Sequence, residues 1–341
     1  MIMTFEHHVQ IDISLISEQK TVLSVLCKSL EKSGISISST QLKKAMSKGA
    51  LWLTRGKYTQ RLRRIKKKLQ IGDELHLYYN ETVLANEVPE AILISDENEY
   101  SVWYKPFGML SQGSKWGDHC TISRYVQKNL TPERSVFIVH RLDRAATGLM
   151  LIAHTKKAAS ALSSMFEQRT VNNNLLEKHY QIIVHGDHSK IQQPQIITKD
   201  IDGKKARSIF YCLAYDKTKD QSLIKVKIES GRKHQIRIHA AESGFPIVGD
   251  RLHGITESDD INNLQLCAIS LSFVCPLNSH DDVITNKHFE LNENFIQPEF
   301  DAEGLYSFRR ITLAPIVIFI GFLVEVYAIM KKPATAVSAE K

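Results

Sequence analysis

Four short polar clusters interrupt otherwise strand-like sequence in the middle of the chain, and they carry the residue types that could do chemistry. They read KPFG at 105–108, HRLDR at 140–144, KHY at 178–180 and SGRKHQIRIH at 230–239. Each cluster by itself has an ordinary structural explanation. A Lys-Pro-x-Gly sequence is commonly a turn, and a tyrosine at the start of a strand is more often packed than catalytic.

Taken together, the clusters could form a reaction centre around Asp143. Arginines at positions 141 and 144 stand on both sides of Asp143 and should keep its carboxylate ionised at neutral pH. A phenol and a guanidinium from other clusters would add a proton-transfer group and an electrostatic partner. This set suits chemistry at a sugar carbon, where a carboxylate attacks or stabilises developing positive charge. Such chemistry needs no metal.

Other classes of protein fit the sequence poorly. It contains neither GxGxxG nor GxxxxGK[ST], which argues against a dehydrogenase or a kinase. The five cysteines include no CxxC pair and are odd in number, so neither a disulfide framework nor a paired-cysteine zinc site fits. His7 and His8 could begin a metal site, but partner ligands are missing. We therefore expect no metal.

The elements that would position the four clusters are mostly strands. Apolar or alternating runs predict strands at 100–104, 136–139, 149–153, 180–184, 209–213, 223–228, 236–239 and 269–274. One helix is predicted at 156–169. Many strands with few helices predict an α+β domain around a mostly antiparallel mixed sheet, over residues 86–297, with 86–97 as its leading linker.

A smaller unit is predicted over residues 1–85. Apolar spacing predicts a helix near 23–30 that stops at Gly34, and Ser39 is a candidate N-cap for a second helix at 41–47. Two strand-like pieces follow at 51–54 and 74–79. Two short helices before a small hairpin predict a compact α/β module.

This first unit carries the positive charge of the chain. Eleven Lys and Arg residues and no acidic residue lie between positions 43 and 68, while the net charge of the whole chain is +7. A mildly acidic body with one basic patch suggests a polyanion bound at one place. A solvated basic face without a ligand is the alternative, although so many cations should repel one another unless something neutralises them. The candidate phosphate-binding residues are Lys43, Lys44, Arg55, Lys57, Arg61, Arg63 and Arg64.

The C-terminal part of the sequence is apolar. After a linker at 298–310, residues 311–332 are predicted to form an apolar helix, and 313–330 contain Glu325 as the only charge. Eighteen residues of helix span about 27 Å, enough for a bilayer core. A membrane anchor is favoured over a buried core helix. The N-terminal residues resemble no secretory signal, so we expect a cytoplasmic protein attached by this helix to the inner face of a membrane.

The polar clusters resemble one family in their order and spacing. HRLDRAATGLMLIAHT, with KPFGMLS upstream and EKHYQIIVHG and IESGRKHQIRIHAAESGFPIVGDRLHG downstream, is similar to the HRLD branch of the RluA-type pseudouridine synthases. The N-terminal SSTQLKKAMSKGALWLTRGKYTQ…LQIGDELHLYY resembles the alpha-L RNA-binding motif, with Thr54-Arg55-Gly56 in place of the usual Asn-Gly turn.

The resemblance implies an enzyme that isomerises uridine in RNA to pseudouridine without a cofactor. It assigns to Asp143 the step at ribose C1′, by covalent attack or by proton abstraction. Tyr180 would stack on the base and help to remove the C5 proton, and Arg237 would hold Asp143 as a carboxylate. An arginine at position 141 would fill the gap left by a flipped nucleotide. The candidate substrate-binding residues are His140, Arg141, Arg232, His234, Gln235 and Lys105.

The partner implied is RNA. A separate basic module favours large-subunit ribosomal RNA over transfer RNA, by analogy with the family. A monomer is the default expectation. Two alternatives stay open: a non-catalytic RNA-binding or ribosome assembly factor that keeps the fold, and a membrane-tethered assembly protein whose main function lies in the tail.

Overall fold

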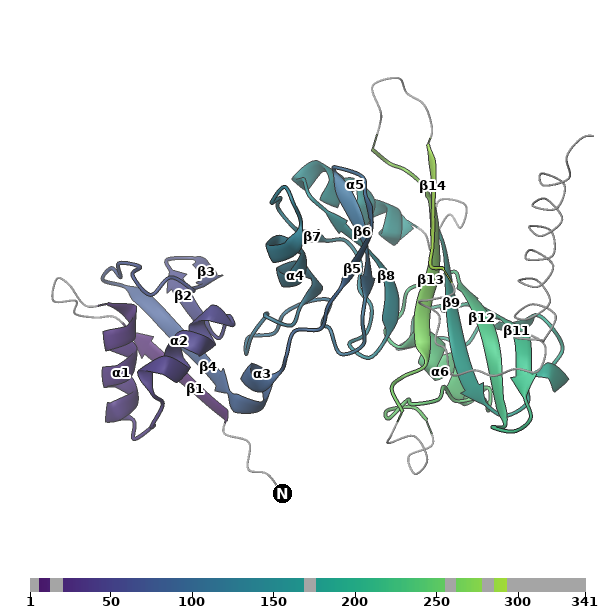
Figure 1. The fold of residues 1–341 in the computed structure, drawn as a ribbon, viewed down its shortest axis with the longest axis horizontal. Helices are drawn as coiled ribbons and strands as arrows, with labels where there is room; N and C mark the ends of the chain where they lie inside the picture. The colour runs from purple at the N-terminus through teal and green to yellow at the C-terminus, as the bar shows by residue number, and fades with distance from the viewer. Residues whose placement is uncertain (1–5, 13–20, 169–175, 255–261, 278–284, 293–341) are drawn as a thin grey trace, which may run out of the picture.

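The computed structural model describes residues 6–12, 21–168, 176–254, 262–277 and 285–292 (Figure 1). Two sheets organise them, one of four strands in the order β1-β4-β2-β3 and one of ten strands. The predicted linker at 298–310 and the predicted apolar helix at 311–332 lie outside the described residues.

The four-stranded sheet and its helices come from the N-terminal part of the chain. Its elements are β1 (Glu6–Asp12), α1 (Val22–Lys32), α2 (Ser39–Ser47), β2 (Leu51–Arg55), β3 (Tyr58–Arg61), β4 (Asp73–Asn80) and α3 (Glu81–Ala85). Side chains alternate along β4, so that Leu75 and Leu77 are buried while His76 and Tyr78 face the other way. The buried leucines pack with Leu26 of α1 and Leu42 of α2 in one apolar core.

Both predicted helices of this unit form, and their ends follow from local chemistry. Gly34, which follows the C-cap Ser33 of α1, has φ +69°, a conformation that a residue without a Cβ adopts freely. The cap of α2 differs from the expectation, because Ser38 rather than Ser39 is the N-cap. The Ser38 Oγ accepts from the N–H of Gln41 at 3.2 Å, and the Gln41 Oε1 accepts from the N–H of Ser38 at 2.9 Å. This reciprocal capping box requires Glu or Gln three residues after the cap, which only Ser38 satisfies.

The ten-stranded sheet has the order β10-β11-β12-β9-β13-β8-β6-β5, with β14 beside β13 and β7 beside β8. Its elements are β5 (Ile92–Asp96), β6 (Tyr100–Lys105), α4 (Ile122–Asn129), β7 (Phe137–Ile138), β8 (Thr147–Ala153), α5 (Lys156–Gln168), β9 (Leu176–His185), η1 (His188–Lys190), β10 (Gln195–Ile197), β11 (Ser208–Asp216), β12 (Gln221–Ile228), α6 (Gln235–Glu242), β13 (Leu266–Val274) and β14 (Asn286–Glu290). Among the described strands, every pair except β8–β13 is antiparallel. The predicted α+β architecture around a mostly antiparallel mixed sheet is confirmed.

Strand β8 lies inside this sheet between β13 and β6, and all seven of its residues are buried. Met150 and Ile152 join one apolar cluster, while Leu149 and Leu151 join another, so both faces of the strand are covered. Gly148 has φ +110°, and a Cβ at this position would lie 2.3 Å from the carbonyl oxygen of Ala268 on β13. Only glycine therefore permits the parallel approach of β8 and β13.

Two segments differ from the sequence expectations. Residues 236–239, predicted as a strand, lie within helix α6. Ile236 and Ala240, one helical turn apart, are both buried in the main core, whereas the alternation of Ile236 and Ile238 suggests a strand. The segment at 86–97, expected to be a linker, contains β5, which pairs with β6 at the edge of the sheet.

The loop at residues 112–118, between β6 and α4, contacts the four-stranded sheet. The indole Nε1 of Trp52 donates to the loop carbonyl at position 115 at 3.0 Å, and Arg61 Nη2 donates to the carbonyl at position 114 at 2.7 Å. Arg63 forms an ion pair with Asp118 at the end of the same loop. The basic unit is thus held against the larger sheet by defined polar contacts.

Candidate active site

A cleft of about 600 Å³ opens between the loop that precedes β8 and the N-terminal end of α6. It gathers residues from clusters that are far apart in the sequence. Eight of the predicted site residues line it: His140, Arg141, Asp143, Tyr180, Arg232, His234, Gln235 and Arg237. The ninth, Lys105, does not line the cleft.

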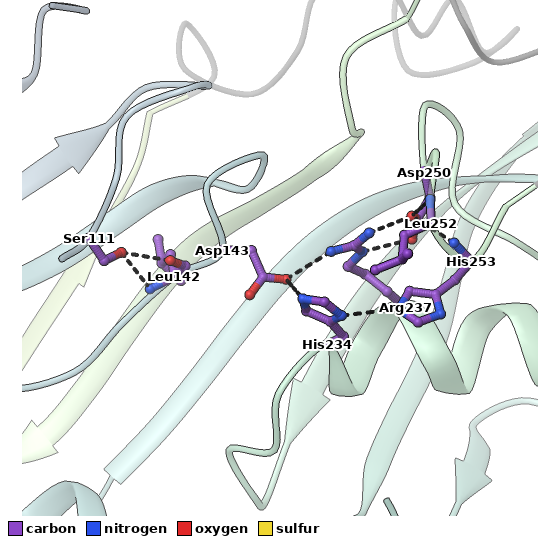
Figure 2. Close-up of polar contacts among 8 residues, drawn as sticks. All are labelled: Ser111, Leu142, Asp143, His234, Arg237, Asp250, Leu252 and His253. Carbon is purple, nitrogen blue, oxygen red and sulfur yellow. Dashed lines mark hydrogen bonds and ion pairs between the residues drawn. The ribbon is translucent and has the colours of Figure 1, made fainter. Parts of the chain in front are cut away.

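The cleft is built around a chain of charges that runs from Asp143 through Arg237 to Asp250 (Figure 2). Arg237 Nη1 donates to Asp143 Oδ2 at 3.2 Å. On its other side Arg237 donates from Nε and Nη2 to the two carboxylate oxygens of Asp250, at 2.8 and 2.6 Å. The Asp143 side chain is 28% exposed, whereas that of Asp250 is 1% exposed. The outer carboxylate therefore faces the cleft, and the inner one fixes the guanidinium.

Asp250 is stabilised as a carboxylate inside the protein. Burial alone would raise the pKa of Asp250. Hydrogen bonds from Arg237 and from the N–H groups of Leu252 and His253, together with the charge of Arg237, outweigh burial and lower this pKa below its ordinary value. Asp250 thus carries a negative charge that keeps Arg237 in place.

His234 lies beside Arg237 and approaches the same oxygen of the Asp143 carboxylate (Figure 2). Its Nε2 is 3.8 Å from Asp143 Oδ2, and its Nδ1 is 3.1 Å from the Nε2 of His253. His234 has φ +55° and immediately precedes α6, an uncommon conformation for a residue with a side chain. Burial lowers the pKa of His234, although the negative charge of Asp143 opposes this effect. One oxygen of Asp143, Oδ2, therefore faces both a guanidinium and an imidazole.

Backbone contacts hold the loop that presents Asp143. The Ser111 Oγ donates to the carbonyl of Leu142 at 2.6 Å and accepts from its N–H at 3.0 Å (Figure 2). The N–H of Gly108 donates to the carbonyl of Arg144 at 3.0 Å. The KPFGMLS segment therefore clamps the loop at the residues on both sides of Asp143.

Lys105 contributes to the same clamp instead of contacting the cleft. Its side chain is fully buried, and its Nζ donates to the carbonyls of Pro106, Met109 and Arg144 at 3.1, 3.0 and 3.4 Å. Burial lowers the pKa of Lys105 to about 7, although the charge of Asp143 opposes this shift. The expectation of direct substrate contact by Lys105 does not agree with this geometry.

Gln235 lines the cleft, but its amide is already fully used. The Oε1 accepts from the Ser230 hydroxyl at 2.7 Å and from the N–H of Arg232 at 3.1 Å. The Nε2 donates to the carbonyl of Arg207 and to the Ser208 hydroxyl, both at 2.9 Å. Because an amide offers two donors and two acceptors, this side chain braces the 230–235 turn and has none left for substrate.

Tyr180 extends into the cleft from the middle of β9 and is 6% exposed. The Nζ of Lys178 lies 5.4 Å from the centre of the Tyr180 ring and 5.6 Å from that of Phe166. The His140 ring stacks on Phe166, with the two ring centres 4.4 Å apart. The His140 Nε2 also accepts from the N–H of Leu151 at 2.9 Å, so this predicted substrate-binding residue is anchored to β8.

Two predicted arginines line the outer part of the cleft. Arg141 is exposed, and its Nη1 donates to Gln112 Oε1 at 3.4 Å. Arg232 is partly exposed, and its Nε donates to the carbonyl of Lys205 at 3.0 Å. Both side chains are within reach of a bound polyanion.

The seven candidate phosphate-binding residues of the N-terminal unit fall into two groups. Arg55 donates from Nε and Nη2 to the two carboxylate oxygens of Asp73, both at 2.7 Å. Arg61 and Arg63 pair with Asp118, with Arg61 Nε at 3.3 Å. These three guanidinium groups have acidic partners within the protein, contrary to the expected run of unpaired cations, although Arg61 and Arg63 share one carboxylate. The exposed cations of the set are Lys43, Lys44, Lys57 and Arg64.

Some features of the site were not assigned from the sequence. Asp250, Ser111, Lys178 and His253 each contact a central residue, yet the motifs that contain Asp250 and Ser111 gave no indication of a role for them. Within the described part of the chain, no group of three or more His, Cys, Asp or Glu side chains could hold a metal ion. The same residues include no helix long and apolar enough to cross a membrane.

Several known proteins are similar to this chain in sequence. Residues 99–242 match the family model described as RNA pseudouridylate synthase, and residues 292–333 match a family described only as a protein of unknown function. An uncharacterized RNA pseudouridine synthase of Aquifex aeolicus is 30% identical over 243 residues, which cover 65% of this chain and 74% of that protein. Ribosomal large subunit pseudouridine synthase C of Buchnera aphidicola is 27% identical over 259 residues, covering 65% of this chain and 78% of that protein.

Among solved structures, human RNA pseudouridylate synthase domain containing 1 is similar, with a TM-score of 0.48 and 19% identity over 63% of this chain and 88% of that one. The family assignment rests on the sequence relatives, because the match to the Aquifex protein at 30% identity extends over 74% of that protein. The family model also covers the segment that supplies Asp143, Tyr180 and Arg237. The chain therefore belongs to the family of RNA pseudouridine synthases.

Proposed function

We propose that the Asp143 cleft isomerises uridine in RNA to pseudouridine, with Asp143, Tyr180 and Arg237 as its catalytic residues. One observation carries the assignment: the Asp143 carboxylate faces the cleft while Arg237, backed by buried Asp250, donates to it at 3.2 Å. A carboxylate held by a fixed guanidinium can act at a sugar carbon without a reorganisation of its partners.

The reaction breaks the N1–C1′ bond of uridine, turns the detached uracil, and forms a C5–C1′ bond. The C5 proton leaves and N1 ends protonated, so the product is an isomer of the substrate. Asp143 acts at the ribose, by attack at C1′ or by proton abstraction, and both routes use the same carboxylate. Tyr180 lies against the base and takes part in removing the C5 proton.

The ribose of a paired uridine is out of reach of a carboxylate in a cleft, so the target nucleotide must leave its stack. Arg141 is exposed at the cleft, where a guanidinium could occupy the vacated position. His140, Arg232 and His234 border the same space. These residues are our candidates for substrate binding, in addition to the three catalytic residues.

The RNA is proposed to be large-subunit ribosomal RNA. Two observations support this choice: the Buchnera relative is named a ribosomal large subunit enzyme, and a separate unit with exposed cations precedes the cleft. The exposed Lys43, Lys44, Lys57 and Arg64 are the proposed phosphate contacts of this unit. A monomer in the cytoplasm is the proposed state.

The test of the enzyme is a comparison of pseudouridine in total ribosomal and transfer RNA with and without the gene. The wild-type gene and an Asp200→Asn control, which changes an exposed carboxylate, should restore the missing pseudouridine, whereas Asp143→Ala should not. If no uridine changes in the deletion strain, or if Asp143→Ala restores modification, the proposed activity is wrong. Growth rescue by Asp143→Ala would favour the non-catalytic assembly factor.

The apolar segment 313–330 is proposed as a membrane anchor on the basis of its composition. A protein that ends at Tyr306 should stay in the supernatant after ultracentrifugation, while the full chain should sediment with membranes. Modification should survive this deletion if the tail only locates the enzyme. If both proteins divide equally between the supernatant and the membrane pellet, segment 313–330 is not a membrane anchor.

A further inference from the structure

The face of the four-stranded sheet opposite α1 and α2 carries a group of aromatic rings that the proposed chemistry does not use. His8 of β1 pairs in register with Tyr78 of β4, so their side chains stand on the same face. The two rings are stacked, with centres 4.3 Å apart and planes at 2°. His76, two residues along β4, has its ring centre 5.9 Å from that of His8. We call His8, His76, Tyr78, Lys115 and Trp116 the ring surface.

Lys115 and Trp116 reach this face from the loop at 112–118. The Trp116 ring meets Tyr78 edge to face, with centres 5.7 Å apart. The Nζ of Lys115 lies 5.2 Å from the centres of both rings. A cation therefore stands beside aromatic rings at the surface, the combination with which proteins bind single-stranded nucleic acid.

Packing between the two parts of the protein accounts for only some of these groups. Trp52 and Trp116 are partly buried where the loop meets the sheet. His8 and Lys115 are exposed, and neither is needed to fill that contact. Glu74 lies 3.6 Å from His76, so the ring surface has an acidic end and a cationic end. A phosphate would be accommodated at the Lys115 end.

The ring surface is continuous in the chain with the wall of the cleft. Gln112 lines the cleft and accepts a hydrogen bond from Arg141, the residue proposed to fill the position of the flipped nucleotide. Lys115 is three positions after Gln112, a span of at most about 11 Å. RNA that leaves the cleft along this loop would meet the ring surface next.

We propose that the ring surface binds an unpaired nucleotide of the substrate RNA that flanks the target uridine, with the base against the rings and the phosphate near Lys115. This inference rests on the proposed function for the identity of the RNA. The ring surface would be a second RNA contact of the N-terminal unit, besides its exposed cations, and it lies on the face of the sheet opposite α1 and α2. Each stacked base contributes enough free energy to change affinity about five- to a hundredfold.

The experiment measures binding separately from chemistry, with a fluorescein-labelled single-stranded 12-residue oligouridine as the probe. The test protein is the full chain with His8→Ala and Lys115→Ala. The control protein carries Tyr211→Ala and Lys217→Ala, which remove one exposed ring and one exposed cation from the β11–β12 hairpin. We expect the Kd for the probe to rise about tenfold or more in the test protein and less than twofold in the control.

A second measurement starts from the wild-type protein, in which oligouridine should quench the tryptophan fluorescence. The conservative variant Trp116→Phe should remove most of the quenching, because Trp103 is buried at 3% exposure and the guanidinium of Arg61 covers the ring of Trp52 at 4.2 Å. An unchanged Kd in the test protein, equal weakening in test and control, or quenching that persists in Trp116→Phe would each overturn the inference. Binding is measured without turnover, so a failure of the proposed isomerase activity would appear only in pseudouridine formation.

Discussion

Replacing Asp250 with asparagine should weaken both the fold and the reaction, because Asp250 holds the guanidinium that contacts Asp143. The two oxygens of Asp250 accept from Arg237 Nε and Nη2 at 2.8 and 2.6 Å, in a place where the Asp250 side chain is 1% exposed. An asparagine of the same shape would turn one acceptor into an N–H group facing another N–H group. It would also remove the negative charge that compensates Arg237.

The magnitude follows from the burial of the pair. Removing one partner of a buried ion pair costs about 3–5 kcal/mol, and Arg237 would keep Asp143 as a second carboxylate, so we expect about 3 kcal/mol of unfolding free energy. For a domain of about 200 residues, this loss lowers the Tm by about 6–12 °C. Misplacement of Arg237 should lower kcat for pseudouridine formation about 10- to 100-fold, because small errors in the position of reacting groups are costly.

The same substitution should change the acid limb of the stability curve. The pKa of Asp250 is lower in the folded protein than in the unfolded chain, so this carboxylate adds stability above about pH 4 and loses it as the pH falls through the folded pKa. The difference in unfolding free energy between wild type and Asp250→Asn should therefore shrink below about pH 4.

Denaturant unfolding at several pH values and single-turnover kinetics on ribosomal RNA would measure these effects. Asp200→Asn is the matched control, because it removes an exposed carboxylate of the same domain and should leave both quantities within error of wild type. Wild-type stability and wild-type kcat in Asp250→Asn would refute the view that this buried carboxylate fixes Arg237.

Three further predictions concern other parts of the fold. Gly148→Ala should give insoluble protein or lose more than about 3 kcal/mol of stability in denaturant unfolding, because its Cβ would meet the β13 backbone at 2.3 Å. The pKa of Lys105 is about 7 in the folded protein, so the fold favours the neutral amine. The unfolding free energy should therefore rise with pH from about 7 to 10.5, and Lys105→Met should flatten this rise. Arg63→Ala should lower the Tm with little change in the salt slope of RNA binding, whereas Arg64→Ala, at an exposed neighbour, should reduce that slope by about one unit and leave the Tm unchanged.

The sequence predicts most of the larger sheet because its strands are apolar on one or both faces. The runs at 100–104 and 149–153 lie in β6 and β8, and the helix at 156–169 is α5 except for its last residue, which is not described. The run at 236–239 was assigned wrongly because four residues are too few to separate a strand from one turn of helix. Ile236 is buried in either conformation, and only the packing of α6 decides between them.

The sequence motifs pointed to the residues that line the cleft, but they did not reveal the residues that hold those side chains and loops in position. Asp143, Tyr180 and Arg237 come together as expected, from segments that are distant in the sequence. Lys105 was expected at the substrate as part of the KPFG cluster, and nothing in these four residues reveals that carbonyl groups enclose its ammonium. The pairing of Arg63 with Asp118, 55 residues later, is equally invisible to local charge patterns.

The basic unit docks on residues 112–118, so the position of the loop that presents Asp143 depends on contacts made by the basic unit. Trp52 and Arg61 bind carbonyls of this loop, and Ser111, the residue before it, holds both backbone groups of Leu142 beside Asp143. Deleting residues 1–85 would therefore release a support of the reaction centre as well as an RNA-binding surface. A truncated enzyme that loses activity would not reveal which loss was responsible, so surface substitutions are better suited than domain deletion to measure RNA affinity in this family member.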